Sequence, residues 1–144
     1  MRTLETSIEI GAPVDRVWEV LAGFDSYPEW NPFVREISGT PVVGERLRAV
    51  LQPPQGRGLT IKPVVTAADP GQRLSWIGRL GVPGVFDGQH LFELTATEVG
   101  TRLVHSETFR GVLVPVLWRS LEAGTRAGFE QMNEALRDRA ESMQ

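Results

Sequence analysis

The hydrophobic pattern changes its period once along the chain, and this change limits the folds that the chain can adopt. From Phe33 to Arg110, stretches of alternating apolar and polar residues are separated by turns rich in Gly and Pro. From about Pro115 to Glu141, apolar residues recur every three or four positions, as in a helix with one buried face. A helix of about 25 residues is close to 40 Å long, enough to cross a domain. The pattern predicts an antiparallel sheet that covers one long helix.

The first third of the chain adds one strand and two short helices. Residues 1–10 alternate as a strand, a helix follows from Pro13 to Gly23, and a helical turn is expected around Ser26–Glu29. The later strands are predicted at 34–38, 45–51, 59–67, 72–79, 85–97 and 101–110. The expected fold is therefore α+β, in the order β-α-α-β6-α, with a curved antiparallel seven-stranded sheet around the C-terminal helix.

Composition indicates one domain, residues 1–144, and excludes several classes of function. The chain has no cysteine, which excludes disulfides, thiol nucleophiles and iron–sulfur clusters. A net charge of -3 argues against electrostatic binding to nucleic acid or to anionic membranes. Residues 1–10 lack a signal peptide, and no apolar run approaches the roughly 20 residues of a membrane helix. We expect a cytoplasmic protein without an integral membrane segment. Because no phosphate-binding loop or dinucleotide fingerprint is present, we expect no cofactor.

Several local strings resemble the START / birch-pollen-allergen superfamily, also called SRPBCC or polyketide cyclase-like. They are IEIGAPVDRVWEVLAGFDSYPEWNPFV at 8–34, DGQHLFEL at 87–94, GTR at 100–102 and the entry to the last helix at 111–118. Residues 86–111 are most similar to an uncharacterised bacterial branch with the pattern FDGxHxFEL followed by GTRxxHxExFxG. The resemblance implies a helix-grip fold with a deep apolar cavity between the sheet and the C-terminal helix. Members bind lipids, sterols or polyketides, and some are cyclases or dehydratases.

The register of the last two predicted strands follows from their apolar faces. If both faces point to the same side, Phe92 pairs with His105 and His90 pairs with Glu107. Directly paired residues have Cβ atoms about 4.5–5.5 Å apart. Two imidazoles and one carboxylate are therefore expected to meet on the concave side of the sheet.

This cluster of His90, His105 and Glu107 has three interpretations. It is a buried polar pair that fixes strand register, a polar anchor for an apolar ligand, or an acid–base site with a histidine as base and Glu107 as the orienting group or acid. No second carboxylate is placed nearby, so we expect no metal site.

The other candidate ligand-binding residues are aromatic or lie on the last helix. Gly124 and Gly128 either allow close packing or leave room for a ligand. The full set, beside the cluster above, is Trp30, Phe33, Trp76, Phe86, Phe92, Phe109, Leu117, Leu121, Gly124 and Gly128.

These observations favour a non-enzymatic protein that binds a small hydrophobic ligand, such as a lipid, a polyketide or an aromatic molecule, in an internal cavity. The alternative is a polyketide cyclase or dehydratase that uses His90, His105 and Glu107. A third class is a protein-interaction module, which leaves open a protein partner or a homodimer. Nucleic acid is not an expected partner.

Overall fold

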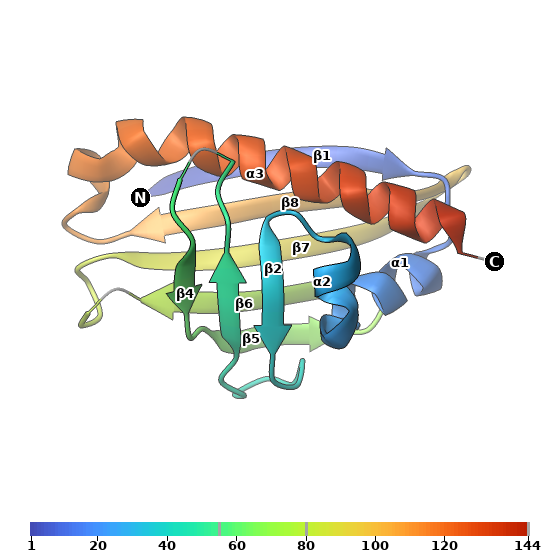
Figure 1. Ribbon diagram of the computed structural model, residues 1–144, viewed down its shortest axis with the longest axis horizontal. Helices are drawn as coiled ribbons and strands as arrows, with labels where there is room; N and C mark the ends of the chain where they lie inside the picture. Colours follow the sequence, from blue (N-terminus) through green and yellow to red (C-terminus); the bar gives the residue numbers. More distant parts are fainter. Residues whose placement is uncertain (55, 80, 144) are drawn as a thin grey trace.

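A computed structural model describes residues 1–54, 56–79 and 81–143. It confirms the expected α+β helix-grip arrangement, in which a large antiparallel sheet lies under a long C-terminal helix (Figure 1). The elements are β1 Arg2–Ile10, α1 Val14–Ala22, the 3-10 turn η1 Phe24–Ser26, α2 Tyr27–Trp30, β2 Val34–Ser38, β3 Arg48–Leu51, β4 Leu59–Ile61, β5 Val64–Asp69, β6 Arg73–Arg79, β7 Asp87–Thr97, β8 Gly100–Arg110 and α3 Val114–Ser142.

The sheet differs from the expected one in its division and in its strand number. The described residues form eight strands in two sheets, in the orders β1-β8-β7-β6-β5 and β2-β3-β4, instead of seven strands in one. The strand expected at 59–67 is interrupted at Lys62 and Pro63, and gives β4 and β5. Proline has no N–H to donate, so it interrupts the ladder at that point.

Pairing nevertheless continues across the bend between the two sheets. Arg46 and Val64 form an isolated bridge, and the amide of Leu47 donates to the carbonyl of Pro63. These contacts hold the two sheets together at the bend. Figure 1 shows the small sheet standing in front of the large one, beside α3.

The two halves of α3 are packed differently. In the C-terminal half, Phe129, Met132, Leu136 and Ala140 are completely buried. In the N-terminal half, Leu121 and its neighbours toward the sheet are only half-buried. Burial of apolar area is the main stabilising contribution in a fold, so the C-terminal half fixes the helix on the sheet. The N-terminal half leaves space beneath it.

Gly128 allows one close contact at the boundary between these halves. A Cβ atom built on Gly128 would lie 2.5 Å from two ring carbons of Phe33, whose ring packs edge-on against Phe129. A Cβ atom on Gly124, one turn earlier, would meet no atom within 4 Å. Gly128 therefore serves packing, because its missing side chain is replaced by the ring of Phe33.

These two glycines give a matched test of the packing. Gly124→Ala should raise the free energy of unfolding by about 1 kcal/mol, since alanine is the better helix former and space is available. Gly128→Ala should lower it, since displacing a packed ring costs about 1–3 kcal/mol and exceeds that gain. Denaturant unfolding of both variants measures the difference. Equal effects of the two substitutions would contradict this assignment.

Candidate functional site

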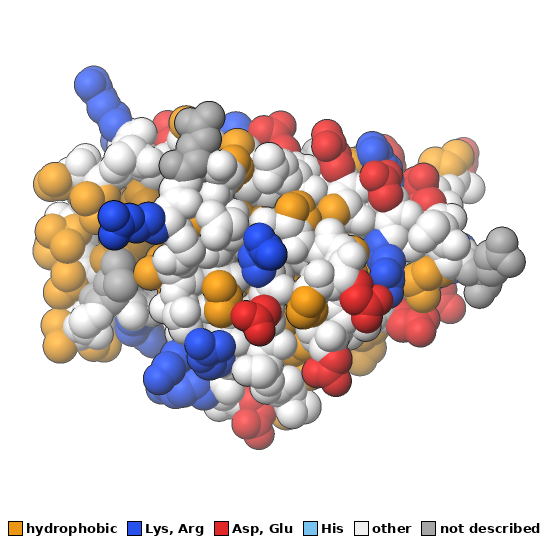
Figure 2. Space-filling view, in the orientation of Figure 1, with side chains coloured by type: hydrophobic (Ala, Val, Ile, Leu, Met, Phe, Trp, Pro, Cys, Tyr) orange, Lys and Arg blue, Asp and Glu red, His pale blue; other side chains and the backbone are white. Residues whose placement is uncertain are grey.

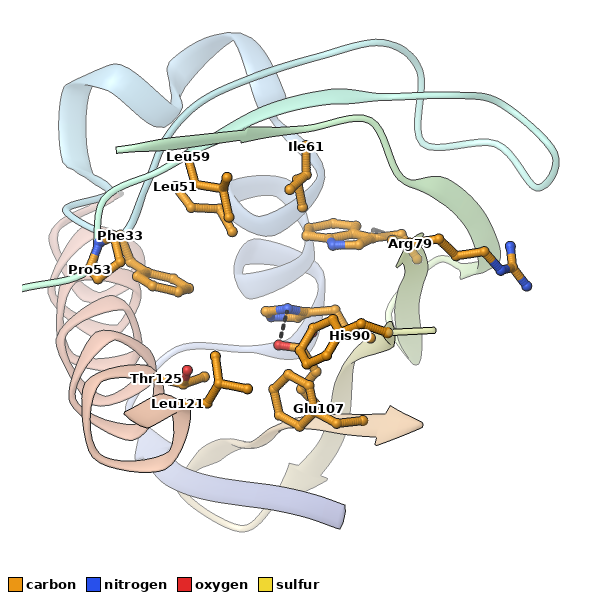
Figure 3. Close-up of a pocket in the computed structure, with 15 residues that line it drawn as sticks. Phe33, Leu51, Pro53, Leu59, Ile61, Arg79, His90, Glu107, Leu121 and Thr125 are labelled. Carbon is orange, nitrogen blue, oxygen red and sulfur yellow. Dashed lines mark ion pairs between the residues drawn. The ribbon is translucent and has the colours of Figure 1, made fainter. Parts of the chain in front are cut away.

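A cavity of about 190 Å³ lies under the N-terminal half of α3. Its walls come from both sheets and from the helix, and most of its lining is apolar (Figure 3). The lining residues are Phe33 after α2; Leu51, Pro53, Leu59 and Ile61 of the small sheet and its connection; Trp76, Gly78, Arg79, Phe86, Gly88, His90, Glu107 and Phe109 of the large sheet and its loop; and Leu121 and Thr125 of α3.

One histidine–carboxyl pair lies on the floor of this cavity. His90 on β7 is paired with Glu107 on β8, as the register analysis predicted, and Phe92 is paired with His105. His90 Nδ1 lies 3.6 Å from Glu107 Oε1, the contact drawn as a dashed line in Figure 3. The His90 side chain is 7% exposed and that of Glu107 is 18% exposed, so the carboxylate is the more accessible partner.

Gly88 makes room for this carboxylate. Gly88 precedes His90 by two residues on the same face of β7, and it also lines the cavity. A Cβ atom at Gly88 would collide with Glu107 Oε2. A glycine at this position therefore lets the Glu107 side chain lie across the strand.

A chain of hydrogen bonds extends from His90 to the opposite side of the core. His90 Nε2 lies 2.5 Å from His105 Nε2, and His105 Nδ1 lies 2.7 Å from Asn133 Oδ1 on α3. Asn133 Nδ2 donates to Thr6 Oγ1 at 2.9 Å, and Thr6 Oγ1 donates to the main-chain carbonyl of His105 at 3.0 Å. The chain therefore links β1, α3, β8 and β7.

The direction of every hydrogen bond in this chain follows from the main-chain carbonyl of His105, with which Thr6 interacts. A carbonyl only accepts, so the Thr6 hydroxyl must donate its one proton to it and accept from the amide of Asn133. The oxygen of Asn133 then faces His105 Nδ1, which must carry a proton. In a neutral His105, Nε2 is an acceptor, and His90 Nε2 must donate to it.

Burial keeps His105 neutral. Its side chain is completely buried and stacks on Phe129, with ring centroids 3.9 Å apart. Desolvation lowers the pKa of His105 well below its usual value, and the neighbouring His90 lowers it further, against the opposing effect of the hydrogen bond that His105 Nδ1 donates to Asn133. His105 is thus a neutral imidazole that accepts from His90 and has no nitrogen free for a ligand.

This arrangement determines which ring nitrogen of His90 faces Glu107. Since Nε2 of His90 is used on His105, only Nδ1 is directed to the carboxyl group. The contact is favourable when one proton lies between the two groups, as imidazolium with carboxylate or as imidazole with carboxylic acid. The floor of the cavity therefore presents a histidine–carboxyl pair that can accept or return a proton.

The structure brings together about half of the candidate residues from the sequence. Phe33, Trp76, Phe86, His90, Glu107, Phe109 and Leu121 line the cavity. The rest lie elsewhere: Phe92 and His105 are completely buried beneath it, Leu117 is half-buried on α3, Trp30 packs against Tyr27, and Gly124 and Gly128 are absent from the lining.

Sequence reasoning missed Asn133 and Thr6. Each is a polar residue on an otherwise apolar face: Thr6 lies between Leu4 and Ile8 on β1, and Asn133 lies one turn after Phe129 on α3. A buried polar side chain needs a partner, so this interruption of the apolar pattern was the available signal. The small sheet's contribution to the lining had no comparable signal.

The described part of the chain lacks two kinds of feature. None of its helices combines the length and apolar character needed to cross a bilayer. It also contains no group of three or more His, Cys, Asp or Glu side chains arranged to hold a metal ion.

The neutral state of His105 predicts a pH dependence of stability. Because its pKa is lower in the folded protein, the unfolded chain binds the proton first as the pH falls below about 6.5. Stability should therefore decline on acidification, by at most about 1.4 kcal/mol per pH unit for this one proton. In His105→Asn the decline should be shallower, as measured by denaturant unfolding between neutral and mildly acidic pH. Parallel profiles would show that His105 does not titrate in this way.

Comparison with known proteins supplies a family and a fold. A search of curated proteins gives no match. Among solved structures, the Zhui aromatase/cyclase from Streptomyces sp. R1128 is 22% identical, with a TM-score of 0.78 over 97% of this chain and 93% of that one. TTHA0849 from Thermus thermophilus is 16% identical, with a TM-score of 0.77 over 98% of both chains.

A third similar structure has two domains. The di-domain ARO/CYC StfQ from the steffimycin biosynthetic pathway is 18% identical, with a TM-score of 0.77 over 96% of this chain and 50% of that one. At these identities the structural matches show a shared fold. A family model described as "Polyketide cyclase / dehydrase and lipid transport" matches residues 1–141, nearly the whole chain. The chain therefore belongs to the polyketide cyclase / dehydrase and lipid transport family.

Proposed function

We propose that this protein binds a small, largely apolar molecule in the cavity under α3, with a polar group of the ligand at Glu107. The observation that carries the proposal is an apolar cavity with one histidine–carboxyl pair on its floor. Ligand sites typically combine an apolar lining with a few polar groups that fix orientation. Membership of a lipid-transport and cyclase family supports the same class of function.

The volume of the cavity limits the size of the ligand. A dry apolar cavity of roughly 150 Å³ is large enough for benzene. The cavity here is slightly larger, at about 190 Å³. It suits a molecule with one or two rings, or a short chain, and a larger ligand would have to displace side chains of the small sheet.

The polar end of the ligand is expected to be a hydrogen-bond donor. Among the described residues no N–H or O–H donates to Glu107 Oε2, and this oxygen lies beside the open position of Gly88. A carboxylate only accepts, so a hydroxyl group satisfies it. A hydroxylated aromatic molecule meets both the size and the polarity of the site.

A second candidate function is acid–base catalysis on a bound carbonyl compound, as in a polyketide cyclase or dehydratase. The observation that favours it is the contact of 3.6 Å between His90 Nδ1 and Glu107 Oε1 at the cavity floor. Such a pair could remove a proton from a carbon beside a carbonyl and return it to a leaving hydroxyl, so that water is lost. In this scheme His105 positions His90 and does not act as the base.

Binding is tested with 2-naphthol and naphthalene, which differ by one hydroxyl group. Calorimetric titration should show binding of both, and stronger binding of 2-naphthol. Ile61→Trp should abolish the binding of both compounds, because the larger tryptophan side chain fills the cavity that Ile61 lines. Glu107→Gln should weaken the binding of 2-naphthol by roughly tenfold, the equivalent of about 1.4 kcal/mol, and leave the binding of naphthalene unchanged.

Val42→Trp is the control for the filling variant, because Val42 is exposed on the loop between β2 and β3. It should bind like the unmodified protein. If neither compound binds, or if Ile61→Trp binds as well as Val42→Trp, the cavity is not the binding site.

Catalysis is tested with linear poly-β-carbonyl compounds and detection of water loss by mass spectrometry. An enzyme should form cyclised or dehydrated product faster than buffer, and Glu107→Gln should reduce the rate by about 10²–10⁴-fold. If the protein binds 2-naphthol but the reaction is no faster than in buffer, the result supports the carrier function and contradicts the enzymatic one.

A further inference from the structure

One end of the molecule exposes large apolar side chains from two loops. Val82 lies between β6 and β7 and is 66% exposed, and Val112, between β8 and α3, is 74% exposed. Val116 in the first turn of α3 is 77% exposed, and the adjacent Leu113 is 41% exposed. Figure 2 shows hydrophobic side chains gathered at this end, where Figure 1 places the two loops and the start of α3.

Main-chain hydrogen bonds hold the two loops together. The amide of Val112 donates to the carbonyl of Gly84 at 3.0 Å, and the amide of Leu113 donates to that of Val85 at 3.1 Å. The exposed side chains therefore lie on two loops that are held side by side. We call Val82, Val112, Leu113 and Val116 the apolar tip.

Arginines surround the apolar tip, whereas the chain as a whole is acidic. Arg110 ends β8, and Arg119 lies on the exposed side of α3 near its start. Arg79 ends β6 and is paired with Asp87, with 3.6 Å between its Nε and Asp87 Oδ1. Arg2 belongs to the same end, because it pairs with Phe109 and its guanidinium lies 5.6 Å from the ring of Trp118.

Acidic residues are scarce at this end. The segments 1–3, 79–87 and 109–119 contain four arginines and one acidic residue, Asp87. The rest of the chain carries 11 of the 15 basic and 17 of the 18 acidic residues. The net charge of -3 therefore conceals a locally positive end.

We propose that this end docks on a lipid bilayer that contains anionic lipids. The apolar tip would enter between the headgroups while the arginines bind lipid phosphates, a combination typical of peripheral membrane contacts. A second copy of this chain fits the surface less well, since a symmetric contact would bring the two sets of arginines together. The same end also reaches the cavity, because Arg79, Phe86 and Phe109 line it. An apolar ligand could thus pass between the bilayer and the cavity.

Vesicle flotation tests this proposal without reference to the ligand. The probes are vesicles of phosphatidylcholine alone and of phosphatidylcholine with about one-third phosphatidylglycerol, at low and high salt. We expect the protein to float with the anionic vesicles only, and binding should decrease as salt is added. The variant Val112→Asp/Val116→Asp should bind at least about tenfold more weakly, since it loses two inserted side chains and gains two negative charges.

The control variant is Val42→Asp/Val43→Asp, because both valines are exposed, at 51% and 61%, on a loop outside the apolar tip. It should bind anionic vesicles like the unmodified protein. Circular dichroism establishes that both variants are folded. The proposal is overturned if the protein floats with neither vesicle, if the two variants bind equally, or if sedimentation shows that the apolar tip instead joins two copies of the chain. Because flotation does not require an occupied cavity, its failure is separate from a failure of naphthol binding.

Discussion

The hydrogen-bond chain from Thr6 through Asn133 and His105 to His90 is the constraint on which the site depends. It begins at a main-chain carbonyl, which only accepts, and this fixes the proton on each later member. It also joins β1, α3 and the hairpin of β7 and β8. A shift of any one of them would leave a buried polar group without a partner, at a cost of about 1–3 kcal/mol. The same bonds that hold the core together therefore direct His90 toward Glu107.

The cavity exists because α3 is not packed onto the sheet around Leu121 and Thr125, which line it. Phe129, Met132 and Leu136 attach the C-terminal half to the sheet, and the ring of Phe33 closes the space at Gly128. Beyond that point the helix and the small sheet enclose a volume that no side chain fills. The polar pair lies at the boundary between the packed core and this volume, where one partner is held by the core and the other is partly exposed. This position suits a group that meets a ligand.

Much of this arrangement could be predicted from the sequence. Alternation in the last hairpin determined which face is buried, and that face determined the pairing of His90 with Glu107, because a one-residue slip would expose every apolar side chain. Alternation could not locate the break at Pro63, since apolar residues continue on both sides of it. It also could not select the lining. Phe92 and Trp76 lie on the same apolar face in neighbouring strands, yet only Trp76 lines the cavity, because the ring of His105 stacks on Phe92 in the buried core.

The most direct test of this account is nitrogen NMR of the two imidazole rings, with and without 2-naphthol. The directed chain predicts that His105 is neutral near pH 7, with its proton on Nδ1, and that its signals remain unchanged when 2-naphthol is added. The signals of His90 should shift, because its Nδ1 faces the carboxyl group that the ligand contacts. A proton on Nε2 of His105, or a charged His105 ring at this pH, would contradict the account and remove the link between the core and the cavity floor.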